Sequence, residues 1–286
     1  MQKRNLLLPM LGTVIFMTTL SSCQNKDNYI NSYGVFLGTT QSEETIKRIK
    51  EYKTIVIEPE EFDKETINQL LNDNIKVYTY LSVGSLETYR DYYDEFKDAT
   101  FMDYENWKEE RWIDVSTEGW KEHIIETAQN SGSTYLFLDN YDVYYIAKDE
   151  YQYGDGYLAD NIYKGLKDIT KSLYDLGFTL MLNSGYDFLE TLYLNNETSY
   201  LKMIDGYNQE TVFSSILDYD NDQFGANSKE DHQYYLDVIY EVNNTYHIPN
   251  IYLLEYTTDS ELIKNIHSYC KTNNYQYYIS SKVNLD

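Results

Sequence analysis

The chain has 286 residues, enough for one large domain or two small ones. Its formal net charge of −24 argues against a nucleic-acid partner, because so acidic a protein repels phosphate groups. The charge would attract a cationic partner, or it reflects the amino-acid usage of a low-GC genome, as do the 33 tyrosines.

The N-terminal residues predict export and a lipid anchor. Two basic residues precede the apolar stretch Leu6–Leu20, which is too short for a stable transmembrane helix. It ends in Leu20-Ser21-Ser22-Cys23, which resembles a bacterial lipobox. The resemblance implies a signal peptide over residues 1–22, a lipidated Cys23 with a short tether over 23–31, and a membrane-anchored protein on the extracytoplasmic face of the cell envelope. An ordinary secreted protein with a chance cysteine is the alternative.

Neither cysteines nor histidines are placed for metal or nucleophilic chemistry. If Cys23 carries lipid, the other cysteine, Cys270, has no partner, and we expect it to be buried in a helix. All four histidines fall in helical stretches or at their ends, which argues against a histidine-based triad or a zinc site. We therefore expect no metal and no cofactor.

From residue 32 to 286, strand and helix signals alternate within one predicted domain. Runs such as Thr54–Ile57 and Tyr135–Leu138 lack polar alternation, which is typical of strands covered on both faces. Ser42 and Asp63 are expected to cap the first two helices. Eight repeats favour a closed (β/α)8 barrel over an open doubly wound sheet, which would normally carry a glycine-rich first turn. The expected strands are Tyr33–Gly38, Thr54–Glu58, Lys76–Val83, Thr134–Asp139, Phe178–Asn183, Lys202–Tyr207, Asn250–Tyr256 and Tyr275–Ser280, and the later helices are Ser116–Gln129, Asp155–Leu176, Lys229–Tyr246 and Asp259–Asn273.

Functional groups in such a barrel lie at the carboxyl ends of the strands. The third connection is the longest and contains an insertion of about Tyr92–Asp114. Carboxylates, amides and tyrosines follow the strands, a set that suits sugars, because carboxylates serve acid–base and nucleophilic steps and aromatic faces stack on sugar rings. The residues at these ends are Glu58, Tyr80, Ser82, Asp139, Asn140, Asn183, Asn208, Glu210, Glu255 and Tyr256.

Four motifs carry a resemblance to a known family. In order and spacing, and over most of the exported chain, they resemble the endo-α-1,4-polygalactosaminidases, glycoside hydrolase family 114. The motifs are Tyr-Thr-Tyr-Leu-Ser-Val-Gly at 78–84, Leu-Phe-Leu-Asp-Asn-Tyr-Asp at 136–142, Leu-Asn-Ser-Gly at 182–185 and Ile-Asp-Gly-Tyr-Asn-Gln-Glu at 204–210.

The resemblance implies a barrel that hydrolyses α-1,4-linked galactosamine polymers with two catalytic carboxylates. These fall on Asp139, implied as the nucleophile, and Glu210, implied as the acid/base, although the residues themselves leave the reverse assignment open. The chain departs from the family at Ser85 and Thr211, where an acidic residue is frequent.

The remaining rim residues are expected to bind the substrate. Asp142 either binds a cationic amine of the sugar or caps the following turn, and Trp112 either stacks on a sugar ring or anchors its loop. We thus predict a monomeric, lipid-anchored endo-glycosidase. The alternatives are a non-catalytic polysaccharide-binding barrel and a hydrolase of another glycan. The expected substrate-binding residues are Tyr80, Ser82, Trp112, Asn140, Asp142, Asn183, Asn208, Glu255 and Tyr256.

Overall fold

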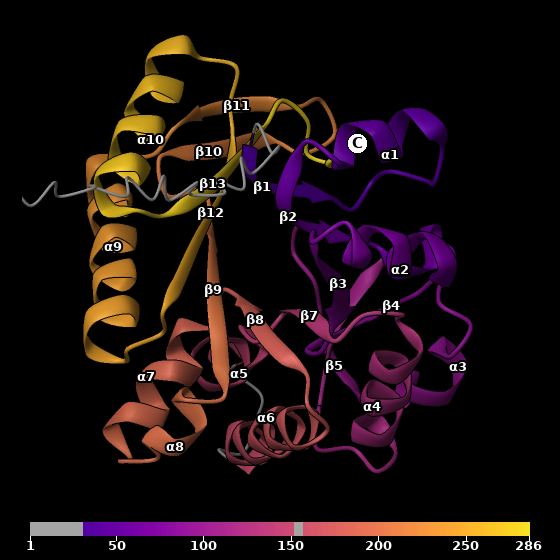
Figure 1. Ribbon diagram of the computed structural model, residues 1–286. Coiled ribbons are helices and arrows are strands. Elements are labelled where there is room, and N and C mark those ends of the chain that lie inside the picture. The colour runs from indigo at the N-terminus through magenta and orange to yellow at the C-terminus, as the bar shows by residue number, and fades with distance from the viewer. Residues whose placement is uncertain (1–30, 152–156) are drawn as a thin grey trace, which may run out of the picture.

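Eight parallel strands form a nearly closed barrel in the computed structural model, which describes residues 31–151 and 157–286 (Figure 1). They hydrogen-bond in the order β1-β2-β3-β7-β8-β9-β12-β13, and the two end strands pack against each other. The predicted (β/α)8 fold and its eight strands are confirmed, whereas the predicted signal peptide and Cys23 lie outside the described residues. The strands are β1 (Asn31–Phe36), β2 (Tyr52–Ile57), β3 (Lys76–Ser82), β7 (Tyr135–Asp139), β8 (Thr179–Asn183), β9 (Ile204–Glu210), β12 (Asn250–Tyr256) and β13 (Gln276–Ser280).

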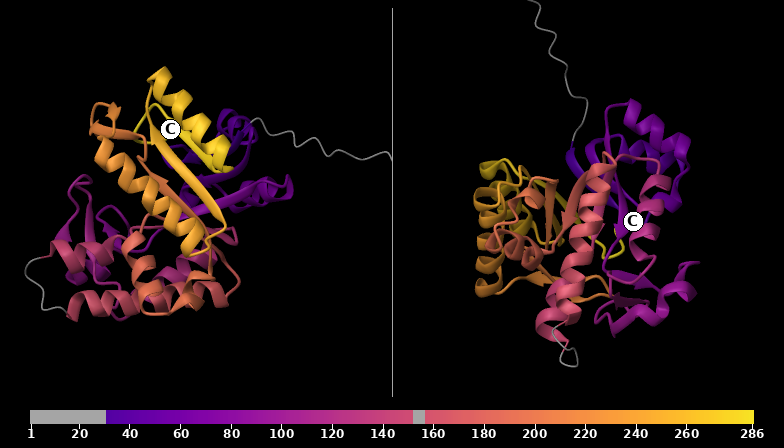
Figure 2. Two further views of the ribbon diagram at one scale, coloured as in Figure 1. Left: turned by 90° about the vertical axis from the view of Figure 1, so that its left-hand side faces the viewer. Right: turned by 90° about the horizontal axis from the view of Figure 1, so that it is seen from below.

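Helices cover the outside of the barrel (Figures 1 and 2). Ser42 and Asp63 cap the first two as predicted, each accepting a hydrogen bond from a backbone N–H of the first turn. None of the described helices is long and apolar enough to span a membrane. The helices are α1 (Glu43–Ile49), α2 (Lys64–Asn72), α3 (Tyr93–Phe96), α4 (Trp120–Asn130), α5 (Val143–Tyr145), α6 (Tyr157–Asp175), α7 (Tyr186–Leu194), α8 (Thr198–Leu201), α9 (Lys229–Tyr240) and α10 (Ser260–Asn273).

Two helices differ from their predicted bounds. α4 begins at Trp120 rather than Ser116, because the backbone N–H and hydroxyl of Ser116 both bond to Asp114 in a preceding turn. α9 ends at Tyr240 and continues as a π-helical turn over Glu241–Thr245. The side-chain bonding between Asp114 and Ser116 competes with helix formation and is not visible in hydrophobic periodicity.

Strand alternation divides the apolar side chains into two sets. One set, which includes Tyr33, Tyr78, Phe137 and Tyr252, fills the barrel interior and is almost fully buried. The other set faces the helices and forms the larger core, in which Cys270 of α10 is buried as predicted. Burial of this surface supplies the main stabilising free energy of the fold. Toward the carboxyl ends of the strands, the interior becomes polar.

Two insertions stand over the carboxyl ends of the strands. The predicted insertion after β3 forms a small antiparallel sheet of β4 (Ser85–Glu87), β5 (Thr100–Asp103) and β6 (Glu110–Ile113). A second insertion, after β9, forms the hairpin of β10 (Ser214–Asp218) and β11 (Gln223–Ala226), which was not predicted. Trp107 from the first and Tyr219 from the second meet edge to face, with ring centroids 5.7 Å apart. The two insertions therefore form facing walls.

Candidate active site

A cleft of about 770 Å³ opens between these walls, and Asp139 and Glu210 lie in it. Strand ends, both insertions and residues 283–285 of the C-terminal segment contribute to its lining. Lys108 is the one basic side chain among the lining residues, so the cleft is strongly acidic. The other acidic lining residues are Glu58, Glu87, Glu109, Glu110 and Asp142, and the aromatic ones are Tyr80, Tyr89, Tyr104, Trp107, Tyr219, Tyr235 and Tyr256.

A single amide holds the two central carboxylates together. Asp139 ends β7, Glu210 ends β9, and Asn183 ends β8, which lies between them. The Asn183 Nδ2 donates hydrogen bonds of 2.8 Å to both Asp139 Oδ1 and Glu210 Oε1. The two carboxylate oxygens are therefore no farther apart than twice that distance.

The two carboxylates have different donors. Asp139 accepts from Asn183, from the backbone N–H of Asn140 and from the Tyr80 hydroxyl. Glu210 accepts from Asn183 and, at 2.9 Å, from the Tyr256 hydroxyl. Burial raises the pKa of both, and for Glu210 the pKa reaches about 7, with the Asp139 charge contributing. Close to neutral pH, one carboxyl group of the pair can thus hold a proton while the other is ionised.

Asp142 is a further carboxylate that lines the cleft, three residues after Asp139. Its Oδ1 accepts a hydrogen bond of 3.1 Å from the backbone N–H of Gly185, in the loop after β8. Burial, aided by the charge of Asp139, raises its pKa to about 7. Asp142 therefore reaches the cleft and anchors a neighbouring loop, rather than capping the turn that follows it. Within the described part of the chain, no group of three or more His, Cys, Asp or Glu side chains is arranged to hold a metal ion.

Four predicted substrate-binding residues, Ser82, Trp112, Asn208 and Glu255, do not line the cleft. Ser82 instead accepts a hydrogen bond of 3.1 Å from the Asn140 side chain, which itself reaches the cleft lining. Trp112 is 4% exposed and stacks on Tyr104 with ring centroids 4.3 Å apart, so it supports the aromatic ring that does face the cleft. Tyr104 lies in an irregular loop, where the sequence shows no periodic signal.

Glu255 is fully buried behind the cleft and organises the loop that follows Glu210. Its carboxylate accepts hydrogen bonds from the backbone N–H groups of Val212, Phe213 and Ser214 and from the Ser214 hydroxyl. Burial nevertheless raises its pKa to about 7. Its side chain points away from the cleft because β12 alternates between its two faces.

Replacing Glu255 with alanine is expected to lower the free energy of unfolding by about 3 kcal/mol or more, because it leaves several buried donors unpaired. Urea denaturation followed by circular dichroism measures this loss. Glu261→Ala is the control, because Glu261 is an exposed glutamate of α10. Equal stability of the two variants would show that the Glu255 bonds are not needed.

Glu58, whose role the sequence left open, belongs to an ion-pair cluster at the edge of the cleft. Arg90 bonds to Glu58 at 3.0 Å, to Glu60 at 2.7 Å and also to Glu87. Even so, burial raises the pKa of Glu58, and that of nearby Glu110 to about 7. One arginine thus offsets only part of the negative charge at this side of the cleft.

The raised pKa values predict that acidification stabilises the protein. Glu110, Asp142, Glu210 and Glu255 each have a pKa of about 7 in the fold, well above the value of about 4 in an unfolded chain. Their contribution to stability is complete below about pH 4 and is lost as pH rises through 7. We expect the thermal unfolding midpoint to be at least roughly 5 °C higher at pH 5 than at pH 8. A midpoint that rises toward pH 8 would contradict these pKa directions.

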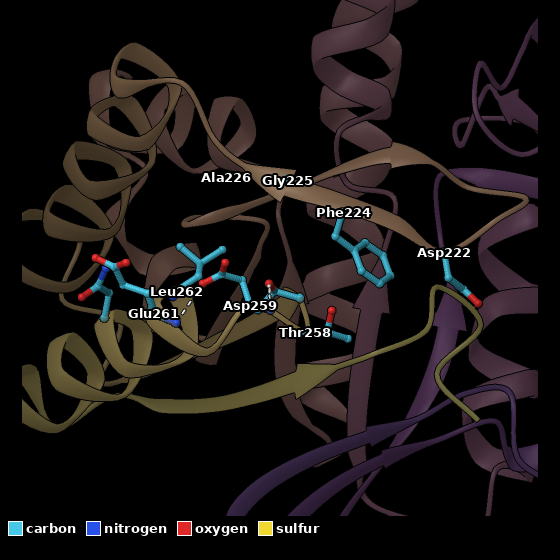
Figure 3. Close-up of a pocket in the computed structure, with 10 residues that line it drawn as sticks. Asp222, Phe224, Gly225, Ala226, Thr258, Asp259, Glu261 and Leu262 are labelled. Atoms are coloured by element: carbon cyan, nitrogen blue, oxygen red, sulfur yellow. Dashed lines mark hydrogen bonds between the residues drawn. The ribbon is translucent and has the colours of Figure 1, made fainter.

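A second groove, of about 640 Å³, lies between the β10–β11 hairpin and the start of α10 (Figure 3). It shares no lining residue with the cleft. Asp259, one of its carboxylates, accepts hydrogen bonds from the backbone N–H groups of Glu261 and Leu262 and so caps α10. The Asp259 carboxylate therefore stabilises α10, and we assign no part of the candidate active site to this groove.

A (β/α)8 barrel with paired carboxylates in an acidic, aromatic cleft defines the protein as a glycoside hydrolase. The model of glycoside-hydrolase family GH114 matches residues 30–281, and the chain belongs to this family. The resemblance found in the four sequence motifs is thereby confirmed.

Solved structures share the fold at low sequence identity. The glycoside hydrolase domain of PelA from Pseudomonas aeruginosa has a TM-score of 0.71 and 13% identity, over 89% of this chain and 96% of that one. Ega3 from Aspergillus fumigatus, crystallised with galactosamine, has a TM-score of 0.64 and 17% identity, over 90% and 92%. TtGalA, an α-galactosidase from Thermus thermophilus, has a TM-score of 0.54 and 10% identity, over 88% and 61%. No curated protein matches the sequence significantly.

Proposed function

We propose that this protein is a lipid-anchored endo-glycosidase that hydrolyses α-1,4-linked galactosamine polymers with retention of anomeric configuration. The observation that carries the proposal is the Asn183 amide, bonded to both Asp139 and Glu210. The two bonds keep Asp139 Oδ1 and Glu210 Oε1 within twice 2.8 Å of each other. This limit is compatible with the carboxyl separation of about 5–5.5 Å in retaining enzymes and favours it over the roughly 6.5–9.5 Å that an inverting enzyme needs to fit a water molecule.

The donors around each carboxylate support their roles. Donation from Asn183 favours the ionised form of Asp139 that a nucleophile needs, and the pKa of about 7 at Glu210 suits a general acid. An Asp139 oxygen attacks the anomeric carbon while the Glu210 proton passes to the departing glycosidic oxygen. Glu210, now ionised, then takes a proton from water, whose oxygen attacks the anomeric carbon and releases Asp139.

The acidity of the cleft supports an amino sugar as the substrate. A galactosamine unit without its acetyl group is cationic, and the lining offers six further carboxylates or carboxylic acids beside Asp139 against one lysine. Galactosamine is also the ligand crystallised with Ega3, a protein of the same fold. The departures at Ser85 and Thr211 bear on sugar preference, because Thr211 lines the cleft and Ser85 bonds to Glu110, which also lines it.

Incubation of the purified protein with acetylated and deacetylated α-1,4-galactosamine polymers tests the proposal. We expect short oligosaccharides by mass spectrometry, with turnover of the deacetylated polymer falling as salt screens the charge attraction. Asp187→Asn is a matched control, since Asp187 is a carboxylate of α7 outside the cleft lining. Saturable binding without cleavage would favour a polysaccharide-binding barrel, and cleavage of other glycans alone would reassign the substrate.

The proposed lipid anchor makes a separate prediction. Because Cys23 would carry the acyl chains, Cys23→Ser is expected to move the protein from the membrane fraction to the soluble or secreted fraction. Cell fractionation with immunoblotting measures this change, and metabolic labelling with a fatty acid shows whether the wild-type protein carries lipid. A Cys23→Ser variant that stays membrane-bound would overturn the anchor.

A further inference from the structure

The Asn183 amide can serve the two carboxylates in only one of its two orientations. Its nitrogen faces both Asp139 and Glu210, and its oxygen accepts a hydrogen bond of 2.7 Å from Asn208 Nδ2. If the amide turned over, its carbonyl oxygen would face the two carboxylates. An amide oxygen and an ionised carboxylate are both acceptors, so no hydrogen bond could form between them. The active pair therefore depends on what fixes this amide.

Asn208, inside the barrel, holds the Asn183 amide in this orientation, and Tyr33 in turn holds the Asn208 amide. The Asn208 Oδ1 accepts a hydrogen bond of 3.1 Å from the Tyr33 hydroxyl. Asn208 is 0% exposed and Tyr33 is 1% exposed, so no solvent replaces a partner that turns away. Turning over the Asn208 amide would place its oxygen against the Asn183 oxygen, at the cost of a buried hydrogen bond.

Tyr33 comes from a strand that is distant in the barrel from the strands of the two asparagines. Tyr33 belongs to β1, Asn208 to β9 and Asn183 to β8, and β1 is not a neighbour of either strand in the hydrogen-bonded order. The Tyr33 hydroxyl thus reaches across the interior. Burial raises the pKa of Tyr33 well above its ordinary value, so its hydroxyl keeps its proton and remains a donor at any working pH.

We propose that Tyr33 is a positioning residue: its hydroxyl, acting through Asn208, orients the Asn183 amide toward both carboxylates. This inference rests on the proposed two-carboxylate function. Tyr33 is not among the residues that line the cleft. The Tyr33 hydroxyl on one side of the barrel therefore controls the hydrogen bonding of Asp139 and Glu210 on the other side.

Tyr33→Phe is the first variant to test, because it removes only the hydroxyl. We expect kcat to fall about tenfold, equivalent to ~1.4 kcal/mol, with KM changed less than about twofold. Weaker donation from Asn183 raises the pKa of both carboxylates, so both limbs of the pH–rate profile should move to higher pH. Tyr252→Phe is the matched control, since Tyr252 is equally buried against Tyr33 and its hydroxyl bonds to Tyr78 and Gln276 instead.

Asn208→Asp gives a second, isosteric test. An aspartate keeps the acceptor for Tyr33 but removes the donor to Asn183, which should then turn its nitrogen away from the catalytic pair. We expect kcat to fall about a hundredfold or more. Carboxyl ¹³C NMR titration of Glu210 supplies a readout that needs no turnover, and its pKa should rise in both variants.

The proposed positioning role of Tyr33 is overturned if the pH–rate profile and the Glu210 titration of Tyr33→Phe coincide with those of the wild type and of Tyr252→Phe. Failure of the proposed function gives a different result: either the wild type releases no oligosaccharide, or Asp139→Asn and Glu210→Gln retain its turnover. In both cases the Glu210 titration, which needs no turnover, still tests the role of Tyr33.

Discussion

Asp139→Asn is expected to reduce kcat on the polymer by about four orders of magnitude, or ~5.5 kcal/mol of transition-state stabilisation. Asparagine keeps the shape of the side chain but is no nucleophile and carries no charge to stabilise the developing positive charge at the anomeric carbon. The fold should survive, because Asp139 lies at the end of β7 and its donors can bond to an amide oxygen. Kinetics on the purified variant measure the loss.

A smaller side chain distinguishes loss of the nucleophile from general damage. Asp139→Gly leaves space for added azide, which should restore turnover and yield a glycosyl azide of inverted configuration. Asp187→Asn, with its carboxylate outside the cleft lining, should keep wild-type activity. Near-normal hydrolysis by Asp139→Asn would remove Asp139 from the mechanism.

Glu210→Gln is expected to lower kcat on the polymer by about three orders of magnitude, because glutamine cannot protonate the leaving sugar oxygen. A glycosyl fluoride or dinitrophenyl glycoside needs no such proton, so bond cleavage on these substrates should fall far less. In the wild type, activity on the polymer should decline as pH rises through about 7, where Glu210 loses its proton. That decline should be absent from bond cleavage by Glu210→Gln.

The comparison between substrates is the informative part of this experiment. Pre-steady-state release of dinitrophenol isolates the first step from hydrolysis of the intermediate, which also uses Glu210 as a base. An equal loss on activated and natural substrates would show that Glu210 positions the sugar rather than supplying the proton.

The barrel was predictable because its signals are strong and local. Runs such as Leu136–Leu138 are buried on both faces, and eight strand signals alternate with helical patterns, of which the first two begin with a capping side chain. The β10–β11 hairpin escaped prediction because its strands are short and partly exposed, and their alternation is weak. Its turn, rich in aspartate, was the one available signal.

The site was predictable where a residue ends a strand, and less so where tertiary pairing decides the direction of a side chain. Asp139, Asn183 and Glu210 meet because they end adjacent strands. β9, however, runs to Glu210 rather than ending at Tyr207, which leaves Asn208 inside the barrel. The contribution of Tyr33 follows from closure of the barrel, and no local pattern near residue 33 reveals it.

The anomeric configuration of the first-formed reducing end tests the central claim most directly. Proton NMR of an early reaction on an α-1,4-galactosamine oligosaccharide follows it before mutarotation. The carboxylate pair bridged by Asn183 predicts the α anomer first, through two displacements at the same carbon. Initial appearance of the β anomer would require a single displacement by water and would contradict Asp139 as the nucleophile.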